Sequence, residues 1–138
     1  MQCYPSRIVK SETSNVKSNP FFMFIKLNHQ SLDVYKAVRQ LIMEIYFISK
    51  RLPTEERFNM VQQMRRAGLS IKLNLAEGAS RRSPIERKRY LEVSRGSLIE
   101  VDAILETAVD LEYFSIDQLA NISGLLNKSF AMLSKMIQ

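Results

Sequence analysis

The segment from Asn74 to Glu86 constrains the fold of this chain more than any other part of its sequence. It spells Asn-Leu-Ala-Glu-Gly-Ala-Ser-Arg-Arg-Ser-Pro-Ile-Glu. Gly78 predicts the end of a helix, because a left-handed C-terminal residue costs glycine little. Ser83 and Glu86 form a Ser-x-x-Glu capping box, and Pro84 stands at the first helical position, where its missing N–H is not needed. The segment therefore predicts a helical hairpin with two arginines in its turn.

Hydrophobic spacing on both sides of this hairpin predicts further helices. Apolar residues recur at intervals of three and four, as in amphipathic helices, and no segment alternates in the manner of a strand. Thr54 is expected to cap the second helix, whose apolar stripe would include Phe58, and Ser115 with Gln118 forms a second capping box. We expect helices over residues 31–51, 54–77, 83–112 and from 115 onward. Their short connections predict an all-α fold, an antiparallel up-down-up-down four-helix bundle.

Small residues occur at facing positions of the predicted hairpin. If the chain turns near residue 81, the pair Ala67-Gly68 lies opposite the run Arg95-Gly96-Ser97. A glycine inside a helix costs about 1 kcal/mol relative to alanine. We therefore expect Gly96 to be offset by a close approach of the second and third helices.

Length and composition indicate a two-part organisation. We predict an N-terminal extension over residues 1–30, partly disordered, and one bundle domain over residues 31–138. Cys3 is the single cysteine and His29 the single histidine, so neither a disulfide nor a metal centre is expected. Adjacent carboxylates such as Glu55 and Glu56 diverge on a helix. The sequence thus predicts no catalytic residues, no cofactor and no enzymatic activity.

The sequence predicts neither a membrane span nor a signal peptide. No apolar run approaches the roughly 20 residues that span a bilayer, and residues 1–20 lack the apolar core of a signal peptide. We expect a cytoplasmic protein without membrane contact.

The formal net charge of +6 is distributed unevenly along the chain. Residues 97–138 hold two basic and six acidic residues, whereas residues 62–96 hold nine basic and three acidic ones. Such polarity indicates either a polyanionic partner or head-to-tail self-association. The basic residues of the central segment are Arg65, Arg66, Lys72, Arg81, Arg82, Arg87, Lys88, Arg89 and Arg95.

The hairpin turn is the candidate binding site for an anion. Arg81 and Arg82 precede the N-terminus of the third helix, whose free N–H groups favour phosphate. The sequence around the turn does not interleave aromatic residues on which nucleic-acid bases could stack. RNA or DNA would therefore be contacted through its backbone. The alternative is a solvated turn whose charges aid solubility. The complete set of candidate contacts is Arg81, Arg82, Arg87, Lys88, Arg89, Arg65 and Arg66.

Two further groups of residues leave alternatives open. Asn74, Glu77 and Arg95 either form a polar site between helices or make caps and inter-helix hydrogen bonds that fix the register. Large apolar residues exceed the needs of one bundle core, which indicates either oligomerisation or a monomer with apolar side chains on its surface. These apolar residues are Tyr46, Phe47, Leu69 and Leu73.

The same residues resemble a known family. The run Ser70-Ile71-Lys72-Leu73-Asn74-Leu75-Ala76-Glu77-Gly78, then Ser80-Arg81, Glu86, Tyr90-Leu91 and Arg95-Gly96-Ser97-Leu98, is similar to the four-helix bundle proteins encoded in 23S ribosomal RNA intervening sequences. Leu32-Asp33-Val34-Tyr35-Lys36-Ala37 fits as well, so the resemblance covers about residues 31–137. A more distant similarity is to the accessory variability proteins of diversity-generating retroelements.

The resemblance implies a left-handed bundle assembled into a ring, commonly a homopentamer, with no known catalytic residues. It implies nucleic acid or a protein such as a reverse transcriptase as the partner. The sequence departs from the family pattern at Lys72, where relatives often have proline, and at Leu73, where they have a small polar residue. A straighter second helix and a larger apolar contact are the expected results.

Overall fold

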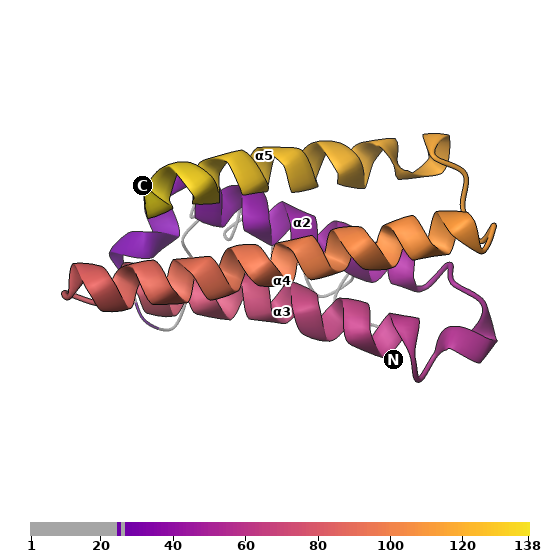
Figure 1. Ribbon diagram of the computed structural model, residues 1–138, viewed down its shortest axis with the longest axis horizontal. Coiled ribbons are helices and arrows are strands. Elements are labelled where there is room, and N and C mark those ends of the chain that lie inside the picture. Colours follow the sequence, from indigo (N-terminus) through magenta and orange to yellow (C-terminus); the bar gives the residue numbers. More distant parts are fainter. Residues whose placement is uncertain (1–24, 26) are drawn as a thin grey trace, which may run out of the picture.

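The computed structural model describes residue 25 and residues 27–138 and consists of helices. Four long helices, α2 (Asp33–Ser49), α3 (Met60–Ala79), α4 (Pro84–Asp110) and α5 (Ala120–Ile137), are joined by short segments (Figure 1). Three 3-10 turns accompany them, namely η1 (Asn28–Ser31), η2 (Thr54–Glu56) and η3 (Asp117–Leu119). No strand occurs in the described residues, which confirms an all-α fold of four helices. The expectation for Cys3 lies outside the described residues, and so does that of a partly disordered extension, apart from residues 25 and 27–30.

The four helices pack around one apolar core. α3 packs most extensively against α4, and α2 lies against both α3 and α5. The α3–α4 turn lies at the same end of the molecule as the C-terminus, and the α4–α5 connection lies at the other end (Figure 1). Side chains from all four helices are fully buried in the core, including Leu41, Ile45, Ile71, Val101 and Leu133.

The second helix begins later than the sequence predicted. Thr54 starts a 3-10 turn of three residues, and Asn59, whose φ of −127° and ψ of −92° are not helical, separates that turn from α3. The expectation that Thr54 caps a long helix was therefore wrong. Phe58, expected on the inner stripe, lies before α3 and is 80% exposed.

The predicted Ser83 cap is present, and the box at Ser115 has both of its reciprocal hydrogen bonds. Ser83 is the N-cap of α4 and its hydroxyl accepts a hydrogen bond from the Glu86 N–H (3.3 Å), with Pro84 at the first helical position. The Ser115 N–H donates to the Gln118 side chain (2.8 Å), and the Gln118 N–H donates back to the Ser115 hydroxyl (3.4 Å). This second box begins the turn η3, and α5 follows at Ala120.

Gly78 lies inside α3, so its predicted role as a left-handed helix stop was wrong. No described glycine has a positive φ, and α3 continues to Ala79. A Cβ at Gly78 would lie 2.9 Å from the Tyr90 Cβ and 3.3 Å from the Arg87 carbonyl oxygen. Gly78 is small because α3 and α4 approach each other there.

The predicted packing role of Gly96 was also wrong. A Cβ at Gly96 would meet no atom within 4 Å, and a Cβ at Gly68 would lie 3.0 Å from Ile45 on α2 rather than near α4. The α3–α4 contact is fixed instead by hydroxyls. Ser70 and Ser97 share a hydrogen bond (2.7 Å). Ser94 donates to the carbonyl of Ile71 (2.7 Å), so α3 and α4 run in opposite directions.

A hydrogen bond ties η2 to the end of α4. The Tyr113 hydroxyl donates to the Glu56 carboxylate (2.8 Å). This bond raises the pKa of Tyr113 to about 12 and lowers the pKa of Glu56.

We predict that Tyr113→Phe raises the pKa of Glu56 toward its ordinary value. The Tyr113 pKa is raised on folding, so the contact stabilises the fold fully below about pH 10 and is lost toward about pH 12. The Glu56 pKa is lowered, so on the acid side the stabilisation is lost as pH falls through its folded pKa. Carboxyl-carbon NMR titration of both proteins measures the shift, and an unchanged Glu56 pKa would contradict the bond.

No helix in the described part of the chain combines the length and the hydropathy that crossing a membrane requires.

Candidate anion-binding surface at the α3–α4 turn

The N-terminus of α4 supplies the positive end of a helix. Pro84 has no N–H, the Glu86 N–H bonds the Ser83 hydroxyl and the Arg87 N–H bonds the Ser83 carbonyl, so the Ile85 N–H is left without a partner within the first turn. The 27 residues of α4 make it the longest helix among the described residues. Arg81 and Arg82 stand in the turn directly before it. The turn therefore places the partial positive charge of the helix N-terminus beside the formal positive charges of the two arginines.

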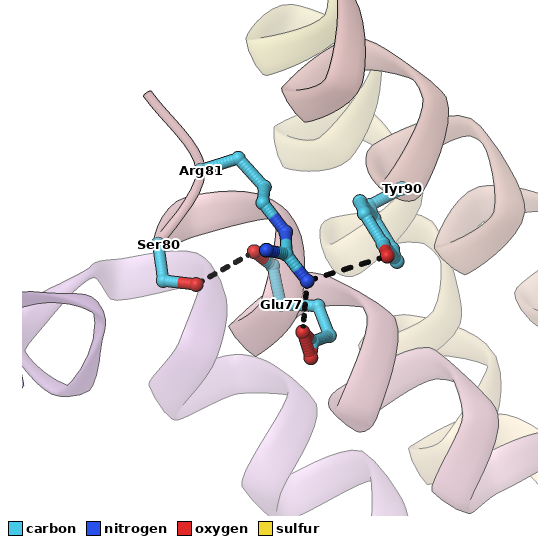
Figure 2. A network of polar contacts seen from close by, with 4 residues as sticks. All are labelled: Glu77, Ser80, Arg81 and Tyr90. Atoms are coloured by element: carbon cyan, nitrogen blue, oxygen red, sulfur yellow. Dashed lines mark hydrogen bonds and ion pairs between the residues drawn. The ribbon is translucent and has the colours of Figure 1, made fainter. Parts of the chain in front are cut away.

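Arg81 is engaged by its own hairpin. Its Nη2 donates to the Glu77 carboxylate (2.6 Å) and lies 3.4 Å from the Tyr90 hydroxyl, with the guanidinium 5.1 Å from the centre of the Tyr90 ring (Figure 2). The Tyr90 hydroxyl and then the Glu77 charge raise the pKa of Arg81 above its already high value. Ser80 adds a bond to the Glu77 carbonyl (2.8 Å). Arg81 thus fixes the turn, with its charge partly balanced by a carboxylate.

The remaining cations of the turn differ in how they are held. Arg87 donates from Nη2 to the Arg81 carbonyl (3.0 Å), which closes the turn. The side chains of Arg82, Lys88 and Arg89 are exposed and form no hydrogen bond or ion pair with any other residue in the described ranges. These three, which we call the turn cations, are the side chains available to an external anion.

Arg65 and Arg66 are not part of this surface. They precede Arg81 by about 15 residues, which on a helix corresponds to more than about 20 Å. Arg65 donates to the Ser49 hydroxyl (2.8 Å) and its guanidinium lies 4.7 Å from the centre of the Tyr46 ring on α2. The sequence placed them in one basic segment, but the fold separates them along α3.

Asn74, Glu77 and Arg95 do not converge on a common site. Asn74 bonds Ser70 one turn earlier, through the carbonyl (2.9 Å) and the hydroxyl (3.1 Å). Arg95 reaches α5, where it donates to the Ser134 hydroxyl (3.0 Å). Glu77 pairs with Arg81. These contacts agree with the alternative of local bonds and inter-helix hydrogen bonds.

Sequence reasoning missed the role of Tyr90. Its Cβ lies against Gly78 and its ring lies beneath the Arg81 guanidinium, so one side chain closes the α3–α4 contact and orients the turn. The spacing from Arg81 to Tyr90 gave no signal, because the two residues belong to different elements.

A separate hollow of the described surface lies elsewhere. It is a groove of about 450 Å³ between α4 and α5, lined mostly by apolar side chains such as Ile99, Leu105, Ile116 and Phe130. Asp102 is the one ionisable residue in its lining. No group of three or more potential metal ligands occurs among the described residues.

The helical hairpin and its surroundings match a family model. Residues 30–135 match the model of the 23S rRNA-intervening sequence protein. The chain belongs to this family. All four helices of the bundle lie within the match, apart from the last residues of α5, so the resemblance noted from the sequence is confirmed.

A solved structure supports the same fold. A crystal structure of a protein of unknown function from the S23 ribosomal protein family, from Bacteroides thetaiotaomicron, superimposes with a TM-score of 0.70 and 24% sequence identity. The alignment covers 76% of this chain and 98% of that chain. No match was found among curated proteins. At this identity the solved relative shows the family fold alone.

Proposed function

We propose that this family member is a non-enzymatic nucleic-acid-binding protein that contacts the phosphate backbone through the turn cations. The observation that carries the proposal is the exposure of Arg82, Lys88 and Arg89 without carboxylate partners in the described residues, beside the N-terminus of α4. Phosphates are bound by such combinations of helix N-terminus and cations. Arg81 and Arg87 hold the turn that presents them.

The charge distribution along the bundle supports this orientation. Acidic residues gather at the opposite end, where α4 finishes and η3 begins, so a polyanion would meet the turn first. The names of the family and of the solved relative both refer to the ribosome or its RNA, which makes structured RNA the first ligand to test. The acidic residues at that end are Glu55, Glu56, Glu106, Asp110, Glu112 and Asp117.

The proposal includes self-assembly of an up-down-up-down bundle into a ring in the cytoplasm. Large apolar side chains remain exposed, with Phe47 at 56%, Leu69 at 42% and Leu73 at 60%. Exposed apolar surface of this kind is typical of contacts between subunits. A ring would repeat the turn cations around an axis and raise avidity.

Fluorescence anisotropy against structured RNA at about 50 and 200 mM salt tests the binding function. Three phosphate contacts per subunit predict that log K falls with log salt at a slope of about −2.7 or steeper. Absorbance at 260 nm in the purified protein gives an early indication, because the chain has five tyrosines and no tryptophan. Affinity that is undetectable at low salt would contradict the proposal.

The second candidate function is a structural or adaptor oligomer, including an accessory role beside a reverse transcriptase. The α4–α5 groove favours it, because exposed Ile99 and Ile116 border a hollow near the acidic end. In this case the basic turn of one subunit would meet the acidic end of the next. Light scattering across a salt series distinguishes the two, since assembly through charges weakens with salt and assembly through apolar contacts does not.

A further inference from the structure

The groove between α4 and α5 has a buried apolar floor and exposed apolar edges. At its edges Ile99 is 52% exposed, Ile116 75% and Phe130 40%. Single exposed apolar side chains are ordinary on a protein surface, but three that border one apolar hollow form a patch of the kind that binds another molecule. The floor consists of buried side chains from α4, η3 and α5, namely Leu98, Leu105, Leu119, Ile122 and Leu126.

The dimensions of the groove match those of a helix. Its lining extends on one side from Leu98 to Val109 and on the other side from Leu119 to Phe130. At 1.5 Å per residue, each side is about 16 Å long, or about three helical turns. Two neighbouring helices leave a channel between them into which a third helix packs, with its axis about 8–10 Å from each of theirs. A helix of three to four turns would therefore cover the floor.

The charged groups beside the floor are acidic. Asp102 belongs to the lining, and Glu106 stands one turn further along the same side of α4. Neither carboxylate forms a hydrogen bond or an ion pair within the described part of the chain. The two cations of α5, Lys128 and Lys135, are rotated about the helix axis by about 140° and 120° from Ser123 in the lining. The groove therefore presents negative charge that the cations of a partner would balance.

The neutral polar groups of the groove also favour a partner that donates hydrogen bonds. Asn127 in the lining donates from Nδ2 to the Ser123 carbonyl (2.9 Å), which leaves its amide oxygen as an acceptor. The nearest arginine is confined to one end of the groove. There the Arg95 guanidinium lies 5.7 Å from the centre of the Phe130 ring and donates to the Ser134 hydroxyl. Lysine or arginine side chains of a partner would therefore find acceptors along the groove.

We propose that the α4–α5 groove binds one amphipathic helix of a partner protein, whose apolar stripe is flanked by lysine or arginine. The stripe covers the floor and the exposed edges, and the cations pair with Asp102 and Glu106. The proposal rests on the adaptor role given above as the second candidate function, for which it names the class of partner, and it does not involve the turn cations. A separate helix suits the groove better than a second copy of this chain, because the four helices of the bundle already bury their apolar stripes in the core.

A synthetic peptide tests the groove directly. The probe is a fluorescein-labelled peptide of about 14 residues, or four helical turns, with leucine at every third or fourth position and lysine beside this stripe. We expect the full-length protein to raise the fluorescence anisotropy of the peptide in a saturable manner. A peptide of the same composition, in which the leucines are redistributed so that no stripe forms, should bind about tenfold more weakly or worse, because it buries less apolar surface.

Charge variants locate the peptide. Asp102→Asn/Glu106→Gln should weaken binding of the lysine peptide by about tenfold. The control Glu44→Gln/Glu92→Gln removes two acidic residues outside the groove lining and should leave the affinity unchanged. Asp102→Lys/Glu106→Lys should reverse the preference, so that a peptide with glutamate in place of lysine binds better than the lysine peptide. A purely structural role of the two carboxylates would not produce this reversal.

The apolar edges provide the last variant, Ile99→Gln/Ile116→Gln. Both side chains are exposed, so the fold should be retained while the affinity for the lysine peptide falls by about tenfold or more. The proposal is overturned if this variant binds the peptide as wild type does, or if the striped and redistributed peptides bind alike or not at all. Light scattering on the same samples identifies the other occupant. Assembly of wild type that is lost in this variant would assign the groove to a second copy and overturn the proposal. Assembly that persists while the peptide fails to bind would overturn the helix-binding groove alone and leave the adaptor role standing.

Discussion

Gly78→Ala should destabilise the bundle, whereas the same substitution at Gly96 should stabilise it. Both glycines lie inside helices, so both alanines gain about 1 kcal/mol of helix propensity. At Gly96 nothing lies within 4 Å of the new Cβ, and that gain remains. At Gly78 the Cβ would meet the Tyr90 Cβ at 2.9 Å and the backbone oxygen of Arg87 at 3.3 Å. Neither atom belongs to the free end of a side chain, so α3 and α4 must separate.

Urea denaturation of the two variants and of wild type measures this difference. Overpacking costs about 1–3 kcal/mol and the propensity gain cancels, so the free energies of unfolding of the two variants should differ by about 1–3 kcal/mol. Because the chemical change is identical, the difference isolates the contact at Gly78. Equal stabilities would show that the helices can part there without cost.

The contrast between the two glycines shows what sequence could predict and what it could not. Glycine in a helical pattern indicates either a stop or a close approach, and the choice depends on the partner element. Gly78 was assigned to a stop because a turn follows it, but the α3 hydrogen bonds continue to Ala79. Gly96 was assigned to a close approach, but it lies on an exposed part of α4. The orientation of each helix about its own axis determines whether a glycine faces a neighbouring helix, and the sequence does not reveal that orientation.

The helices themselves could be predicted because their signals are local. The Ser83 cap, Pro84 and the spacing of apolar residues fix α4 within its own sequence. The start of α3 could not be predicted, because the η2 segment is held partly by the Tyr113–Glu56 bond from the far end of α4. A contact between residues so distant in sequence leaves no periodic signal.

The candidate site was predicted in position but not in composition. All seven cations lay in one basic segment, yet among those near the turn only the turn cations are presented without partners in the described residues, and Arg66 is exposed far from the turn on α3. Arg81 contacts Glu77 and Tyr90, and Arg65 contacts Ser49 and Tyr46. Side-chain pairing across helices, which depends on register, determined which charges remain available.

Replacing the turn cations should weaken RNA binding strongly. The variant Arg82→Gln/Lys88→Gln/Arg89→Gln removes three contacts with phosphate, and each contributes about 0.9 to the salt slope. The slope should therefore become shallower by about 2.7, and at about 0.1 M salt the affinity should fall on the order of a hundredfold. Anisotropy titrations at several salt concentrations measure both quantities. Glutamine keeps the polar character of these exposed positions, so the fold should be preserved.

A matched control variant distinguishes the effect of where the cations lie from the effect of the protein's net charge. Arg51→Gln/Arg57→Gln/Arg66→Gln removes the same charge from exposed residues, two before α3 and one in its first half. If RNA binds at the α3–α4 turn, this variant should keep most of the affinity for RNA and nearly all of the salt slope. Equal losses in the two variants would mean that RNA responds only to the overall charge of the protein. A larger loss in the second variant would assign the surface to the other end of α3, where the sequence had also placed Arg66. Only a loss confined to the first variant supports the α3–α4 turn as the binding surface.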